Sequence, residues 1–148
     1  MKNMKLRRVS YSPGYCDMLG EYHSVSLEKG GDGKWTFVCR DRSIHSEPTV
    51  VCAYEVSDED VSRFEEFILK NKVVSLENRP KSDMFATDYS PWRWSLDYER
   101  TSFGKTERRY CGIDEYKRYS AGDYKLLNEL SERLYALRGE KLSEKTED

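Results

Sequence analysis

Apolar and polar residues alternate from Trp92 to Tyr98, in the stretch that holds two of the three tryptophans of the chain. Successive side chains of a strand point to opposite faces, so Arg93, Ser95 and Asp97 share one face. The other face is heavily aromatic and carries Trp92, Trp94, Leu96 and Tyr98. The pattern predicts a β-strand that buries its aromatic face and exposes the face with Arg93.

The same alternation occurs on both sides of a glycine-rich segment nearer the N-terminus. Residues 22–28 alternate, Gly30-Gly31-Asp32-Gly33 follows, and residues 34–40 alternate again. Glycine adopts positive φ angles at low cost, so this arrangement predicts a β-hairpin. Further strands are predicted at residues 50–56, 73–76 and 106–111, the last of these returning after a turn at residues 100–105.

Two segments show the helical spacing of apolar residues instead. Residues 58–71 have one apolar stripe, and Ser57 with the three acids after it predicts the helix start. Residues 123–138 have a second stripe, and Gly139 predicts its end. The stripes consist of Val61, Phe64, Phe67 and Ile68 in the first helix and of Tyr124, Leu127, Leu130, Leu134 and Leu137 in the second.

The faces of these elements determine the expected fold class. Each helix has one apolar stripe and each strand alternates, so an antiparallel sheet with both helices on one face satisfies all of them. We therefore expect a single α+β domain over residues 1–139, with five or six strands and two amphipathic helices. Residues 140–148 are expected to be a charged, flexible C-terminal tail.

Composition narrows the class of protein. Aromatic residues make up 13% of the 148 residues, which argues against disorder. The net charge of -2 counts against a nucleic-acid partner, because such proteins neutralise phosphates with Lys and Arg. No stretch approaches the ~20 apolar residues of a membrane span, and the basic start lacks the apolar core of a signal peptide. These features predict a cytoplasmic protein of bacterial type with no membrane partner.

The cysteines predict no metal site and no cofactor. Cys16, Cys39, Cys52 and Cys111 form no C-x-x-C pair, and their separations match no zinc-ligand spacing. Four reduced thiols are expected in the cytoplasm, and two disulfides are the alternative for an exported protein. Gly30-Gly31-Asp32-Gly33 joins two strands and precedes no helix, so it is interpreted as a turn and not as a phosphate loop.

No recognisable catalytic motif is present, and the protein is expected not to be an enzyme. The alternative is a small enzyme whose pocket lies between the sheet and the loops at residues 11–21 and 77–91. Cys16, His23, Asp88 or Arg93 would line that pocket, with Cys16 and His23 as a nucleophile pair. His45 lies in a polar loop and is interpreted as solvated.

Residues 100–119 form the one locally basic segment. Four aromatic residues are interleaved with six basic and three acidic residues there. Basic groups beside aromatic rings bind single-stranded nucleic acid by screening phosphates and stacking on bases. A nucleic-acid binder that uses this hairpin is therefore a further alternative, beside the plain interpretation as an exposed hairpin of mixed charge.

The leading hypothesis is a non-enzymatic binding domain for a protein or a small molecule. Residues 77–91 form a long predicted loop with two prolines and several aromatic residues, and long loops are more often functional. Aromatic residues and arginine are enriched in interfaces, so Phe85, Tyr89 and Arg93 are the expected binding residues. A homodimer that forms through an exposed strand edge is the third possibility.

Overall fold

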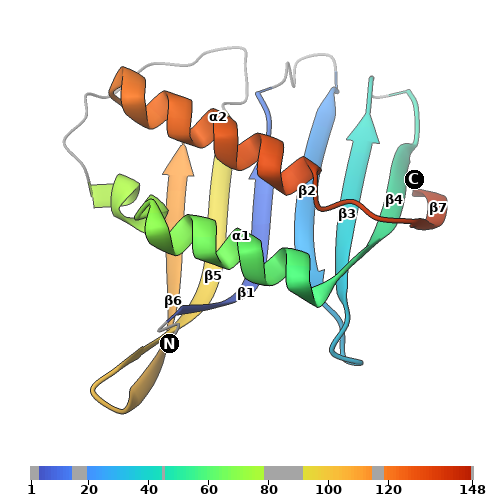
Figure 1. Cartoon of the computed structure of the whole chain (residues 1–148). Coiled ribbons are helices and arrows are strands. Elements are labelled where there is room, and N and C mark those ends of the chain that lie inside the picture. Colours follow the sequence, from blue (N-terminus) through green and yellow to red (C-terminus); the bar gives the residue numbers. More distant parts are fainter. Residues whose placement is uncertain (1–3, 15–19, 45, 79–91, 115–118, 148) are drawn as a thin grey trace.

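The structure is a computed structural model that describes residues 4–14, 20–44, 46–78, 92–114 and 119–147. These residues form an α+β fold around one antiparallel sheet of seven strands (Figure 1). The sheet order is β6-β5-β1-β2-β3-β4-β7, so β6 and β7 are the two edges. The strands are β1 (Met4–Ser12), β2 (Tyr22–Lys29), β3 (Trp35–Arg42), β4 (Thr49–Val56), β5 (Arg93–Ser102), β6 (Lys105–Asp114) and β7 (Lys141–Glu147).

Two helices, α1 (Asp58–Lys70) and α2 (Ala121–Tyr135), lie across the same face of the sheet (Figure 1). Each begins at a serine whose hydroxyl accepts a backbone N–H three residues on. Ser57 Oγ accepts from Asp60 at 3.2 Å, and Ser120 Oγ accepts from Asp123 at 3.1 Å. These contacts satisfy N–H groups that the first turn of a helix leaves unpaired. Their placement confirms the two predicted helices.

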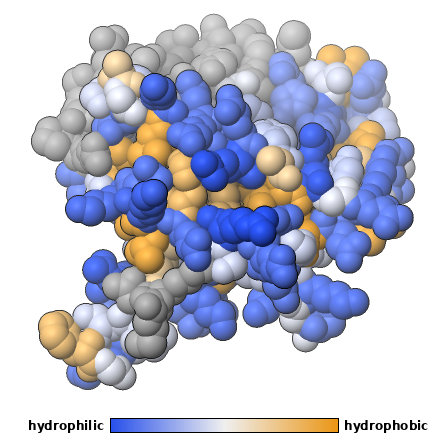
Figure 2. Space-filling model, viewed as in Figure 1, coloured by the Kyte–Doolittle hydropathy of each residue, from blue (hydrophilic) through white to orange (hydrophobic). Residues whose placement is uncertain are grey.

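The core lies between the sheet and the two helices. Trp94 is only 1% exposed and stacks on Tyr11, with 4.3 Å between the ring centroids. The outer surface of the helix layer is mostly hydrophilic, as Figure 2 shows. The core confirms the predicted buried faces, with Leu27, Phe37, Leu96 and Tyr98 from the sheet and Phe64, Ile68, Leu127, Leu130 and Leu134 from the helices.

The expected count of five or six strands is too low. Strand β1 was not predicted, and it occupies the centre of the sheet between β5 and β2. Residues 73–76 were predicted as a strand but form part of a 3-10 helix, η2 (Val73–Asn78). The run Val73-Val74-Ser75-Leu76 is short and apolar, and its two buried residues, Val73 and Leu76, are spaced three apart as one turn of that helix requires.

The segment expected to be a flexible tail contributes a strand instead. Strand β7 pairs with β4 along its length, from Thr49 opposite Glu147 to Tyr54 opposite Lys141. Nearly all its residues are exposed because it forms the edge of the sheet. Charged side chains are typical of such an edge, since they discourage pairing with another chain.

Candidate binding face

The helices cover one face of the sheet, and in the described part of the chain no helix covers the other (Figure 1). We call this second surface the open face. Its residues are those that alternate with the core residues along each strand. Arg93, Ser95, Asp97 and Glu99 of β5 lie on it, since Trp94, Leu96 and Tyr98 point into the core.

A β-bulge in β1 changes which side chains reach the open face. Leu6 lies opposite Tyr98 of β5 and Arg8 lies opposite Asp97, so Arg7 is the extra residue. Leu6 and Val9 both point into the core although they are three residues apart. The bulge therefore brings two consecutive arginines, Arg7 and Arg8, to the open face. Bulges often redirect side chains in this way near functional sites.

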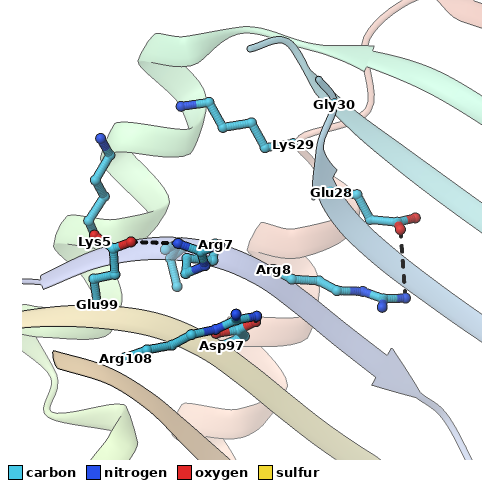
Figure 3. Close-up of a pocket in the computed structure, with 10 residues that line it drawn as sticks. Lys5, Arg7, Arg8, Glu28, Lys29, Gly30, Asp97, Glu99 and Arg108 are labelled. Atoms are coloured by element: carbon cyan, nitrogen blue, oxygen red, sulfur yellow. Dashed lines mark hydrogen bonds and ion pairs between the residues drawn. The ribbon is translucent and has the colours of Figure 1, made fainter. Parts of the chain in front are cut away.

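A hollow of about 400 Å³ lies beside this bulge (Figure 3). That volume is within the usual range of small-ligand sites. Five basic and three acidic residues line the hollow, a local net charge of +2 (5 − 3) in a chain whose net charge is -2. The basic residues are Lys5, Arg7, Arg8, Lys29 and Arg108, and the acidic residues are Glu28, Asp97 and Glu99.

Each of the three arginines of the hollow forms an ion pair with an acidic residue (Figure 3). Arg108 makes two hydrogen bonds to Asp97, at 2.7 and 3.1 Å, and this guanidinium lowers the pKa of the Asp97 carboxyl. Arg7 pairs with Glu99 at 2.5 Å, and Arg8 lies 3.7 Å from Glu28. A guanidinium has five N–H donors, so these pairs orient the arginines and leave donors for a further anion.

A row of small side chains crosses the open face next to the hollow. Each of the seven strands contributes one residue with a short side chain, and the strand register places each of these residues opposite the one on the neighbouring strand. Ser26 in this row is only 3% exposed, and its hydroxyl donates a hydrogen bond to Glu28 at 2.8 Å. We call this row of short side chains the trough, and it consists of Gly112, Ser95, Ser10, Ser26, Val38, Ala53 and Ser143.

Charge differs between the two sides of the molecule. Helix α1 has five acidic and two basic residues, a net charge of −3 (2 − 5). On the open face, Arg93 and Arg40 lie beyond the trough and add to the basic residues of the hollow. The basic hollow and helix α1 therefore carry local charges of opposite sign on opposite sides of the sheet.

Arg93 is exposed on the open face, between Ser12 of β1 and Asp114 of β6. Phe85, Tyr89 and the rest of the predicted loop fall almost wholly outside the described residues, as do Cys16 and Asp88. Of the three expected binding residues, only Arg93 therefore lies within the described part of the chain, and the prediction for Phe85 and Tyr89 stays a prediction. The structure places Arg93 in the same sheet face as Arg7, Arg8 and Arg108.

His23, a residue of the alternative enzyme pocket, is held between two carboxylates. Nδ1 lies 2.8 Å from Asp41 and Nε2 lies 3.0 Å from Glu21. Partial burial opposes the charged ring, but these hydrogen bonds outweigh it and raise the pKa of His23. Both nitrogens face acceptors, so the arrangement favours the imidazolium form, which has no free lone pair to act as a base.

The described cysteines do not have the properties of nucleophiles. Burial raises the pKa of Cys39 to about 11, and it also raises the pKa of Cys52. Cys111 is 4% exposed. A thiol that stays protonated near neutral pH is a poor nucleophile. In the described ranges no three His, Cys, Asp or Glu side chains gather in a way that could hold a metal ion.

The hairpin of β5 and β6 is longer than the sequence predicts, and it extends beyond the rest of the sheet (Figure 1). Every residue from Arg100 to Tyr110 is exposed. The Arg108 guanidinium stacks over the ring of Tyr110 at 5.3 Å. The basic segment singled out in the sequence is therefore an exposed hairpin as far as residue 110, and residues 115–118 fall outside the described part.

The charged hollow was missed in the sequence because its residues come from four strands, β1, β2, β5 and β6. One signal was present in Met4-Lys5-Leu6-Arg7-Arg8-Val9-Ser10-Tyr11, where apolar residues alternate, slip by one at the two arginines, and alternate again. Such a slip is typical of a bulged strand.

None of the helices in the described ranges has the length and apolar composition of a membrane span. Comparison with known protein families, with curated proteins and with solved structures finds no significant match to this chain.

Proposed function

We propose that the protein is a non-enzymatic binding domain whose open face receives an acidic segment of a protein partner. The observation that carries this proposal is the group of three arginines, Arg7, Arg8 and Arg108, around the hollow on the open face. Arginine pairs with carboxylates through two parallel hydrogen bonds and is enriched in interfaces.

The shape of the open face suits an extended acidic segment. The trough of small residues lets a partner backbone approach the sheet closely. The hollow beside it has room for carboxylate side chains, and Arg93 offers a further positive charge on the far side of the trough. The predicted loop with Phe85 and Tyr89 leads directly into β5 along the chain, so we keep these residues as additional contacts.

Binding of a labelled hexaglutamate peptide, followed by fluorescence anisotropy, tests the proposal. We expect Arg7→Gln and Arg108→Gln each to weaken binding by about fivefold, because each removes about 1 kcal/mol of charge-assisted contact. Binding should also weaken as salt is added, since the contacts are screened.

Two arginines of the helix layer provide matched controls. Arg63 pairs with Asp60 at 3.3 Å and Arg133 pairs with Glu129 at 3.2 Å, so each is an exposed arginine with one carboxylate partner. Arg63→Gln and Arg133→Gln should leave hexaglutamate binding unchanged. Equal losses in all four variants, or no binding by the native protein, would contradict the proposal.

The expected loop contacts need a separate test once a partner is known. We expect the triple change of Phe85, Tyr89 and Arg93 to Ala to weaken partner binding by more than Arg93→Ala alone. If the triple variant and the single variant bind equally well, the loop is not part of the binding surface.

A further inference from the structure

Phe103 lies at the tip of the β5–β6 hairpin, which projects at the lower left of Figures 1 and 2. Ser102 pairs with Lys105, so Phe103 and Gly104 alone form the turn. Both have positive φ angles, 52° for Phe103 and 77° for Gly104. This is the pattern of a type I′ turn, in which the first position favours Asn, Asp or Gly.

The fold gives no reason for a phenylalanine at this position. Its relative exposure is 104%, so no neighbouring residue covers it. A bulky residue with positive φ is strained, and an exposed apolar ring gains nothing from folding. A residue that the fold disfavours in both respects is better explained by a contact outside the molecule.

The charge of the hairpin indicates what kind of surface it fits. The exposed stretch from Arg100 to Tyr110 has four basic residues and one acidic residue, a net charge of +3 (4 − 1). The complementary site is therefore an apolar hollow with an acidic rim. The basic residues are Arg100, Lys105, Arg108 and Arg109, and the acidic residue is Glu107.

A hollow of that kind lies on the same molecule, where the β2–β3 turn, the end of β4 and the start of α1 meet. Its volume is about 480 Å³. Trp35 and Val56 line it as core residues that are only 7% and 5% exposed, and Leu142 of β7 is the exposed apolar side chain beside them, at 60%. Three acidic residues and one basic residue line it, a net charge of −2 (1 − 3), with Asp32, Glu55 and Asp58 against Lys34.

The hairpin cannot reach the acidic hollow of its own molecule. Strands β1 and β2 separate β5 and β6 from β3, β4 and β7, a span of roughly 20 Å at the usual strand spacing. We propose that the hairpin tip of one molecule inserts Phe103 into the acidic hollow of a second copy. The contact joins two different surfaces, so it is head-to-tail.

Solution mass by sedimentation equilibrium tests this contact, from about 10 µM to about 1 mM, because a small interface gives Kd values of about 10⁻⁴ to 10⁻³ M. We expect the average molecular mass of the native protein to rise above that of the monomer as the concentration increases across this range. Phe103→Asn should weaken association by about tenfold or more, the lower end of what burying one phenylalanine contributes. The double change Glu55→Lys with Leu142→Ser should weaken association to a similar extent, because it alters the acidic hollow that receives the hairpin tip.

Mixing the two variants gives the sharpest result. The Phe103→Asn protein keeps an intact hollow and the double variant keeps an intact tip, so together they should form a 1:1 complex that grows no further. Circular dichroism of each variant verifies that it is folded, and Ile44→Ser, a change at another exposed apolar residue, should leave association unchanged. A native protein that stays monomeric at 1 mM, or a mixture that stays monomeric, would overturn the proposal.

Discussion

Phe103 adopts a backbone conformation that its side chain disfavours, and this strain has a consequence for stability. Asn tolerates positive φ well at the first position of a type I′ turn. We therefore expect Phe103→Asn to raise the free energy of unfolding by about 1 kcal/mol. Urea denaturation of the isolated monomer measures the change. A lower free energy of unfolding in the variant would mean that the ring stabilises the fold after all.

His23 links stability to pH. Its pKa in the folded protein is raised above the ordinary value of 6.5, so the folded state holds the proton more tightly than the unfolded state. The contribution of His23 to the free energy of unfolding is fully present below pH 6.5, and it is lost as the pH rises through the pKa of His23 in the folded protein. We expect the urea midpoint to fall over that interval, and to fall less in His23→Gln. An equal fall in both proteins would show that the ion pairs to Asp41 and Glu21 contribute nothing.

Single residues differed in how well the sequence predicted their environment. The burial of Trp94 and Leu96 follows from strict alternation in β5, and the exposure of Arg93 follows from the same pattern. The Asp41 carboxylate beside His23 could not be predicted, because Asp41 lies on the neighbouring strand and its position opposite His23 depends on the β2–β3 register.

At the scale of elements, the β1 bulge makes a sharp prediction about chain length. Deleting Arg7 leaves Met4-Lys5-Leu6-Arg8-Val9-Ser10-Tyr11, in which apolar and polar residues alternate without interruption. We expect this deletion to keep the fold, with the free energy of unfolding changed by no more than about 1 kcal/mol. Thermal and urea unfolding measure it, and the hexaglutamate affinity should fall as for Arg7→Gln.

The matched control for this prediction is deletion of Ser10, which also removes one residue from β1. This deletion turns either Val9 or Tyr11 out of the core, because one residue of slip reverses every face beyond it. The Ser10 deletion should lower the free energy of unfolding by about 2 kcal/mol or more. If both deletions destabilise the protein equally, the bulge is required by the fold and is not an insertion that the fold tolerates.

The elements that the sequence did not predict share a physical reason. Alternation of apolar and polar residues predicts a strand only when the alternation is unbroken and when one face of the strand is buried. The bulge breaks it in β1, and β7 buries neither face because it is an exposed edge. In η2 the run Val73 to Leu76 is too short for a strand and a helical turn to be distinguished by spacing. The hairpins and both long helices meet the conditions and were predicted.

At the scale of the whole molecule, the arrangement of layers separates the charges. Both helices cover one side of the sheet, α1 brings its acidic residues to that side, and the arginines of β1, β5 and β6 remain on the other. This separation depends on strand order, which places β1 between β5 and β2. Local pattern does not encode strand order, so the hollow at the open face could not be predicted from the sequence.

The central claim is that the open face is the binding surface of this protein. Amide chemical-shift mapping of the native protein during a hexaglutamate titration tests it most directly. We predict that the shifts cluster around the hollow and the trough, at residues such as Arg7, Ser10, Ser95 and Arg108, and that α1 is unaffected. Shifts confined to the hairpin tip or to the basic residues of α2 would contradict the claim, since they would place acidic ligands elsewhere.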